Sequence, residues 1–234
     1  LGSITRSPRE ICDAAGLTHF RTSISVELKA ATSLNDLVKL RDYDLGPDEQ
    51  IALLKKQFGE TAALFAMDRP PICTCGEVKL WHGVVESNGN SQHITDWYSP
   101  SHFTHGLIMY GLAVLLWRRW RVLGGRPARW ALPIAVAVEA GWEILENTPL
   151  IINRYREATI SLGYTGDSIV NSASDIMWMT LGFLLALRLP GWASVALGLF
   201  LELLALAVIR DNLTLNVLML VWPIDAVAAW QAAG

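Results

Sequence analysis

Residues 102–234 of this chain contain no lysine, and charged residues are scarce throughout. They make up 18% of the 234 positions, against 52% hydrophobic residues, and the mean hydropathy is +0.31. Such an apolar composition is unusual for a soluble domain and typical of a membrane protein. The chain also lacks a basic stripe with interleaved aromatics, which excludes nucleic acid as a partner.

Long apolar segments fill residues 101–234. A bilayer core about 30 Å thick requires roughly 20 helical residues. We predict five spans, at 101–120, 127–147, 167–188, 191–210 and 215–230. The last span is short, and Pro223 is expected to kink it. The connection 118–129 contains five arginines and no acid, which indicates the cytoplasmic or matrix side, so the polar motifs share the outer side.

Residues 1–67 lack a segment that could cross a bilayer and are predicted to form a soluble helical hairpin. Its helices are expected at about 34–41 and 47–58, the second ending at Gly59. Residues 68–100 would form a loop segment on the outer face, and 101–234 the transmembrane bundle. The predicted fold is therefore all-α, a polytopic membrane helix bundle with a soluble N-terminal hairpin. The hairpin is too small for its own core, so we expect Leu54 and Phe58 to dock on another subunit.

Acids and histidines recur at helical spacing inside the apolar segments. Three stripes result, formed by His102 and His105, by Glu139, Glu143 and Glu146, and by Asp167, Asn171 and Asp175. Residues three or four positions apart share one helix face. Ionisable groups within a bilayer are costly and are usually functional or partnered, so these stripes are expected to face each other. The glycines Gly106, Gly111, Gly141 and Gly182 could permit close helix contacts.

Four members of these stripes are candidate ligands of a divalent metal, namely His102, His105, Glu143 and Asp167. Mixed histidine and carboxylate ligation suits zinc, iron or manganese. A bound metal would acidify water and drive hydrolysis of a lipid-linked ester or phosphate. The spacing is not a diagnostic signature such as His-Glu-x-x-His. A buried hydrogen-bonded network that ties helices together is the alternative interpretation.

Two arginines complete the set of catalytic candidates, beside Glu143 and Asp167. Arg154 and Arg156 lie in the connection 148–166, where either guanidinium could hold an anionic headgroup. We also predict that one of them pairs with Asp167 or Glu146.

The chain has only three cysteines. Cys73 and Cys75 form a possible thiol site on the outer side, where oxidation can occur, but one intervening residue makes a mutual disulfide a tight ring. Pairing with Cys12, a metal half-site with His82 or His93, and free thiols remain open.

Several longer motifs occur in a fixed order. They are Ile-Cys-Thr-Cys-Gly at 72–76, Lys-Leu-Trp-His-Gly at 79–83, Asp-Trp-Tyr-Ser-Pro-Ser-His-Phe-Thr-His-Gly at 96–106, Trp-Glu-Ile-Leu-Glu-Asn at 142–147, Arg-Tyr-Arg-Glu-Ala-Thr at 154–159 and Arg-Asp-Asn-Leu-Thr-Leu-Asn at 210–216. Together they closely resemble an uncharacterised inner-membrane protein family of alphaproteobacteria, over about residues 68–231. The polar residues are more distantly similar to VanZ-like membrane proteins. The resemblance carries no established activity. Bacterial members place a span before the Cys-Thr-Cys motif, where this chain has only the short apolar run 61–67.

The N-terminal extension suggests an origin. The sequence begins at Leu1, and no secretory or transit peptide is recognisable. We therefore expect a mitochondrial inner-membrane protein whose polar face is toward the intermembrane space; the alternative is a bacterial inner membrane with that face periplasmic. The expected function is an accessory subunit of a larger membrane assembly, such as a respiratory complex. The alternative is a membrane-embedded, metal-dependent hydrolase or transferase acting on a lipid headgroup. Membrane lipids, including a bound phospholipid, and other subunits are the expected partners.

Overall fold

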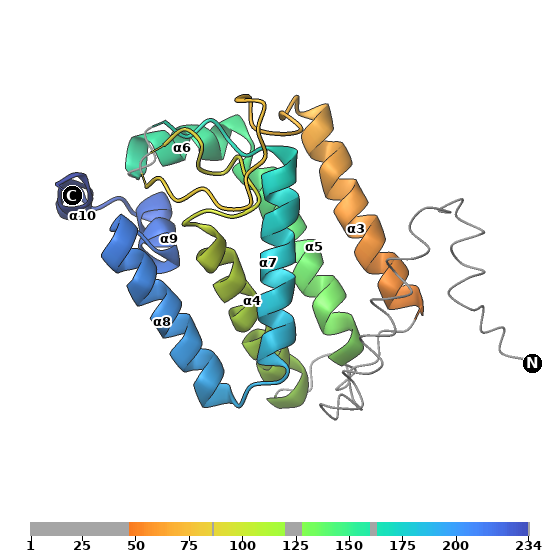
Figure 1. Cartoon of the computed structure of the whole chain (residues 1–234). Helices are drawn as coiled ribbons and strands as arrows, with labels where there is room; N and C mark the ends of the chain where they lie inside the picture. The colour runs from red at the N-terminus through yellow and green to blue at the C-terminus, as the bar shows by residue number, and fades with distance from the viewer. Residues whose placement is uncertain (1–46, 86, 120–127, 160–162, 234) are drawn as a thin grey trace, which may run out of the picture. The chain divides into compact units, whose positions relative to one another are not determined.

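The structure, a computed structural model, describes residues 47–85, 87–119, 128–159 and 163–233 (Figure 1). The chain divides into two compact units, Leu1–Asp44 and Leu45–Gly234, and the described residues belong to the second. The predicted helix at 34–41 and Cys12 lie outside the described residues. Every regular element of the described segments is helical, which confirms the all-α class.

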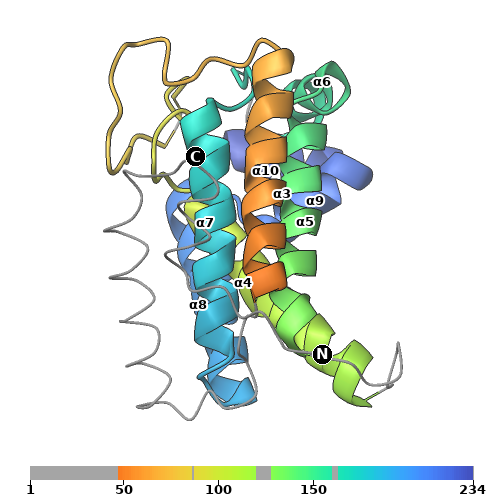
Figure 2. The ribbon, with the colours of Figure 1, turned by 90° about the vertical axis from the view of Figure 1, so that its right-hand side faces the viewer.

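The helices of the second unit follow one another along the chain as α3 (Pro47–Ala66), α4 (Ser99–Ala113), α5 (Ala128–Glu146), α6 (Pro149–Ala158), α7 (Ile169–Ala186), α8 (Gly191–Ile209), α9 (Leu213–Val221) and α10 (Asp225–Ala232). A π-helical segment, η1 (Val114–Arg119), extends α4. Helix α7 packs against α4 and α5, while α8 lies on the other side of α4 (Figure 1). Helix α3 runs beside α5 (Figure 2).

Two glycines allow α4 and α7 to pack backbone against backbone. A Cβ atom at Gly106 would lie 2.0 Å from a carbonyl oxygen of α7, and one at Gly182 would lie 2.0 Å from a carbonyl oxygen of α4. Small residues permit this approach, which brings the two polar stripes of these helices together. The predicted close contact is confirmed at these positions. It is wrong for Gly111 and Gly141, where a Cβ would meet nothing within 4 Å.

Two helices of the described segments, α7 and α8, have the length and composition to cross a membrane. In α7, 56% of the apolar window is buried, because this helix lies in the bundle; in α8 only 11% is buried. Side chains such as Trp192, Leu199 and Leu203 give α8 a broad apolar outer surface.

The predicted five-span bundle is not confirmed. Helix α5 contains Glu139, Glu143 and Glu146, too many acids for an ordinary span. The fifth segment is broken around Pro223 into α9 and α10, which have 9 and 8 residues. At about 1.5 Å per residue, neither approaches the bilayer thickness. The connection 120–127 lies outside the described residues, so the sidedness of the bundle stays a prediction.

Helix α3 continues beyond its predicted end at Gly59. Glu60 and Leu64 are fully buried where α3 packs on α5 and α7. Burial of a leucine side chain contributes roughly 2 kcal/mol, which exceeds the cost of about 1 kcal/mol for a glycine inside a helix. Leu54 and Phe58, the residues expected to meet another subunit, are 49% and 64% exposed.

The loop between α3 and α4 is bound to the start of α7. Arg69 donates to the carbonyl oxygens of Thr165 and Asp167, and Gln92 donates to that of Gly166. The Asn171 amide donates to the carbonyl oxygen of His93 at 2.8 Å. These contacts fix the backbone around Asp167, which precedes α7 and carries one of the candidate side chains.

Candidate functional site

A single buried carboxylate organises the two histidines of α4. Oε1 of Glu139 lies 2.9 Å from Nδ1 of His102 and 2.9 Å from Nδ1 of His105, and Glu139 is 1% exposed. Because a carboxylate only accepts hydrogen bonds, each imidazole donates from Nδ1. In the neutral form of either ring Nε2 then carries no proton and can bind a metal, the arrangement found where a carboxylate orients a metal-binding histidine.

Glu143 and Asp175 lie next to His102 without forming ordinary hydrogen bonds to it. Oε1 of Glu143 is 3.6 Å from Nδ1 of His102, and Oδ2 of Asp175 is 3.8 Å from Nε2. Glu143 is completely buried, and neither of its carboxylate oxygens has a hydrogen-bond partner. The 3.8 Å between Oδ2 of Asp175 and Nε2 of His102 is close to the roughly 3.4 Å that separates two ligands of one tetrahedral cation, each about 2.1 Å from the ion. The three side chains, whose ligand atoms lie within 4.8 Å of one another, could therefore hold a metal.

Asp167, which groups with Glu143 and Glu146, accepts hydrogen bonds from two neighbouring side chains. The hydroxyl of Tyr164 donates to Oδ1 at 2.8 Å, and the amide of Asn147 donates to Oδ2 at 2.7 Å. Burial raises the pKa of Asp167, while these two hydrogen bonds favour its ionised form. Burial and the nearby Asp167 also raise the pKa of Tyr164 well above its usual value, which keeps its hydroxyl a donor.

A cavity of about 960 Å³ opens beside the cluster. Its polar wall is formed by His102, His105, Glu139, Glu146, Tyr164, Asp167 and Asp175. An apolar wall is formed by Met109, Val138, Leu213, Val217 and Ala228. Among the described residues, no lysine or arginine lines the cavity. A bound cation would add the positive charge to which an anionic ligand could bind.

The four predicted metal-ligand candidates lie in this one cluster. His102 groups with Glu143, and Glu143 in turn groups with Asp167. His105 contacts the cluster through Glu139. The sequence placed Glu139 and Asp175 in the polar stripes, but neither was among the four candidate metal ligands. Their spacing placed them on the correct faces, but only the folded geometry shows which nitrogen each histidine presents. Metal binding itself stays a prediction.

The two arginines lie outside the cavity wall. Arg154 donates from Nε to the carbonyl oxygen of Leu220 at 2.8 Å, and Arg156 donates to that of Tyr164. Among the described residues, neither forms an ion pair with an acid, so the predicted pairing with Asp167 or Glu146 is wrong. Both guanidinium groups are occupied by backbone acceptors that the sequence does not reveal.

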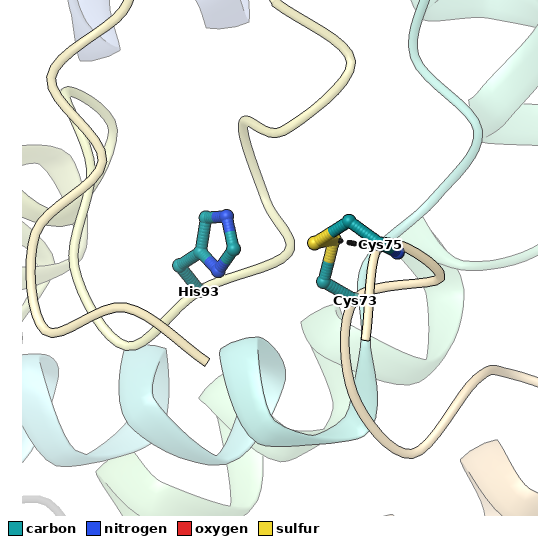
Figure 3. A group of neighbouring side chains, drawn as sticks. All are labelled: Cys73, Cys75 and His93. Atoms are coloured by element: carbon teal, nitrogen blue, oxygen red, sulfur yellow. Dashed lines mark hydrogen bonds between the residues drawn. A yellow bond between two sulfur atoms is a disulfide. The ribbon is translucent and has the colours of Figure 1, made fainter. Parts of the chain in front are cut away.

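Cys73 and Cys75 form a disulfide with each other, despite the tight ring that one intervening residue imposes (Figure 3). The backbone N–H of Cys75 donates to Sγ of Cys73 at 3.2 Å. His93 approaches the pair, with a ring nitrogen within 4.8 Å of both sulfurs. The disulfide leaves no thiolate for the proposed metal half-site in this state.

The fold and the cluster define a helical bundle protein with a buried histidine–carboxylate centre beside a partly apolar cavity. The chain belongs to the family described as proteins of unknown function, DUF2585, which matches residues 64–233. A UPF0314 protein of Novosphingobium aromaticivorans is 58% identical over 171 residues, covering 73% of this chain and 86% of the relative. UPF0314 proteins of Rhizobium meliloti and Sinorhizobium fredii are 59% and 60% identical over 166 residues, covering 71% of this chain and 81% of each relative.

These comparisons confirm the predicted membership of an uncharacterised alphaproteobacterial family. No solved structure matches the chain. The relatives are bacterial, which agrees with the alternative of a bacterial protein and gives no support to a mitochondrial location or a respiratory role. The more distant similarity to VanZ-like proteins stays a prediction.

Proposed function

We propose that the protein is a membrane-embedded, metal-dependent hydrolase or transferase that acts on a lipid headgroup. The carboxylate of Glu143 carries this proposal, because it is fully buried, has no hydrogen-bond partner and lies beside His102 and Asp175. An ionised carboxylate in such a place costs several kcal/mol unless a charge compensates it. A divalent cation bound to Nε2 of His102 would supply that charge.

The charges of the whole cluster support a cation. Four acids gather there, Glu143, Glu146, Asp167 and Asp175, and in the described part of the chain none forms an ion pair with lysine or arginine. Carboxylates at this spacing repel one another strongly when they are desolvated. Cation binding would remove the repulsion, which would explain why four acids lie together.

The chemistry follows from the same geometry. A bound cation lowers the pKa of a coordinated water, so that hydroxide forms near neutral pH. The hydroxide oxygen would attack the phosphorus or carbonyl carbon of the headgroup, and the bond to the leaving alkoxide would break. A carboxylate of the cavity wall that does not bind the cation would accept the proton from water and return it to the alkoxide. With an alcohol in place of water, the same step is a transfer.

The apolar surroundings favour a lipid as the substrate. Met109, Val138 and Val217 line the cavity together with the acids, and they can contact acyl chains. The exposed apolar surface of α8 suits contact with the bilayer. Arg154 and Arg156 do not line the cavity and donate to backbone carbonyl oxygens, so the proposal assigns them no role in holding the headgroup.

Purified protein in detergent tests the proposal. After chelation, Mn²⁺ or Zn²⁺ is added, and headgroup release from vesicles of phosphatidylglycerol and phosphatidylethanolamine is followed by mass spectrometry. We expect metal-dependent release that Glu143→Gln abolishes. The matched control is Glu77→Gln, which removes an exposed loop carboxylate far along the chain from the cluster. Release that needs no metal, or that survives Glu143→Gln, would refute the proposal.

A second candidate function, an accessory subunit of a membrane assembly, is favoured by one surface of α3. Ile51, Leu54, Phe58 and Phe65 are 37–66% exposed and follow one helical stripe. Another subunit of the assembly would cover this stripe. Native mass spectrometry of gently solubilised membranes distinguishes the two, because Phe58→Asp should release the chain as a monomer if it is a subunit and change nothing if it is a solitary enzyme.

A further inference from the structure

We propose that the site holds two divalent cations and that the carboxylate of Glu143 bridges them. This inference rests on the proposed function and specifies its chemistry. The first cation would be bound by His102, Glu143 and Asp175. The second would be bound by Glu143, Glu146 and Asp167, whose ligand oxygens lie within 4.8 Å of one another. Glu143 is the one residue that belongs to both groups.

The unpartnered oxygens of the cluster indicate that the second group is a binding site. Both oxygens of Glu143 and Oε2 of Glu146 are buried and receive no hydrogen bond. Glu143 is completely buried, so water cannot compensate its charge. Two free oxygens on one carboxylate, between two groups of ligands, match a bridge in which each oxygen binds a different ion.

The surrounding residues hold the second group in place. Asn147 donates to one oxygen of Asp167 and Tyr164 to the other. The Asn147 amide also donates to the carbonyl oxygen of Glu143 at 2.9 Å, which ties Asp167 to the end of α5. Such hydrogen bonds to ligating carboxylates fix their orientation and tune metal affinity.

Helix geometry places the ligands at the correct intervals. Glu143 and Glu146 are three positions apart on α5, and Glu139, one turn earlier, orients the histidines. Bundles build two-metal centres from inward-facing pairs with this spacing. Glu143, the proposed bridging residue, is therefore the middle member of the α5 stripe Glu139, Glu143 and Glu146.

The ligand types select the metal and the substrate class. The second group offers only oxygens, which favours Mg²⁺ or Mn²⁺, whereas the first adds an imidazole nitrogen, which Mn²⁺ also accepts. Two-metal sites with ions roughly 3.5–4 Å apart stabilise both the attacking and the leaving oxygen of phosphate esters. No lysine or arginine of the described segments lines the cavity, so two cations would be the groups that bind the anion. The substrate class is therefore a phosphate-bearing lipid headgroup.

Mn²⁺ binding to the full-length protein in detergent tests the inference. Equilibrium dialysis should give two Mn²⁺ ions per chain, and electron paramagnetic resonance should show the spectrum of two coupled ions. Glu146→Gln should reduce the content to one ion and abolish the coupling. Asp167→Asn should do the same, which covers the case in which one variant does not fold. Asp175→Asn should also leave one ion, but at the oxygen-only group.

The outcomes separate the two proposals. One uncoupled ion per chain, unaffected by Glu146→Gln and Asp167→Asn, would overturn the bridged pair while the metal-dependent hydrolase survives. No bound ion in a folded wild-type protein would overturn both.

Discussion

Glu139 determines which nitrogen of His102 and of His105 faces the cavity. Both rings donate to it from Nδ1, which leaves Nε2 of His102 as the atom that would bind the first proposed cation. We predict that Glu139→Gln weakens Mn²⁺ binding about 10- to 100-fold, the usual effect of losing such a partner, because a glutamine amide no longer favours one tautomer in both rings. Calorimetric titration measures the change. Glu139→Asp, which keeps a carboxylate, should restore part of the affinity; equal affinity in all three proteins would contradict this role.

Asp211 gives the fold a pH dependence that is independent of the cluster. Burial raises its pKa from 3.8 to about 6. The folded form therefore favours the protonated acid, so its stabilisation is complete below about pH 4 and is lost as the pH rises through about 6. The difference corresponds to about 3 kcal/mol. We expect the thermal midpoint in detergent to fall over this range more steeply for the wild type than for Asp211→Asn. Parallel pH profiles would exclude the effect.

Part of the site could be predicted from the residue pattern. Three-and-four spacing placed His102 on one face of α4 and Glu143 on one face of α5, and Asp167 lies just before the first turn of α7. Their hydrogen bonds could not be predicted, because they depend on which nitrogen or oxygen meets which neighbour. The predicted ion pair of Arg154 was wrong for that reason, because its guanidinium donates to a backbone carbonyl oxygen that no sequence motif indicates.

At the scale of helices, the α4–α7 contact is the one on which the cluster depends. Gly106 lies on it and Gly111, five residues further along the same helix, does not. We predict that Gly106→Ala destabilises the protein by about 2 kcal/mol, since overpacking typically costs 1–3 kcal/mol. Gly111→Ala should be neutral or stabilising, because alanine favours a helix. Thermal unfolding of both variants measures this, and equal midpoints would show that α4 and α7 are not in close contact.

Helix limits were predicted well where local chemistry sets them and poorly where packing does. The start of α3 at Pro47 follows from the proline and the acids after it. Its end depends on the burial of Leu64 in the bundle, which the local sequence does not indicate. The break between α9 and α10 surrounds Pro223, which the sequence marked only as a kink. The start of α9 has a stronger cause, because Glu202 accepts hydrogen bonds from the backbone N–H groups of Leu213 and Thr214.

For the whole molecule, composition predicted a membrane protein with five spans, and two helices of the described segments have the length and hydropathy of a span. Apolar length alone does not distinguish a helix that faces lipid from one that packs inside a bundle. In the structure α7 and α8 meet the length and hydropathy criterion, and they differ in burial.

That difference predicts how lipid contacts the molecule. A photoactivatable phosphatidylcholine in nanodiscs should crosslink to α8, whose Leu199, Phe200 and Leu203 are about 60% exposed, and should spare Ile176 and Phe183 of α7. Peptide mass spectrometry locates the adducts. Absence of labelling on α8 would show that this surface meets protein or water instead of lipid.

Metal binding by the buried carboxylates around Glu143 is the property on which the proposed chemistry depends. Anomalous diffraction at the manganese edge from crystals grown with Mn²⁺ tests it most directly. We predict two peaks about 4 Å apart, one beside Nε2 of His102 and one beside Asp167, with Glu143 between them. A well-ordered cluster that shows no anomalous peak, with the acids hydrogen-bonded to each other as protonated carboxyls, would contradict the account.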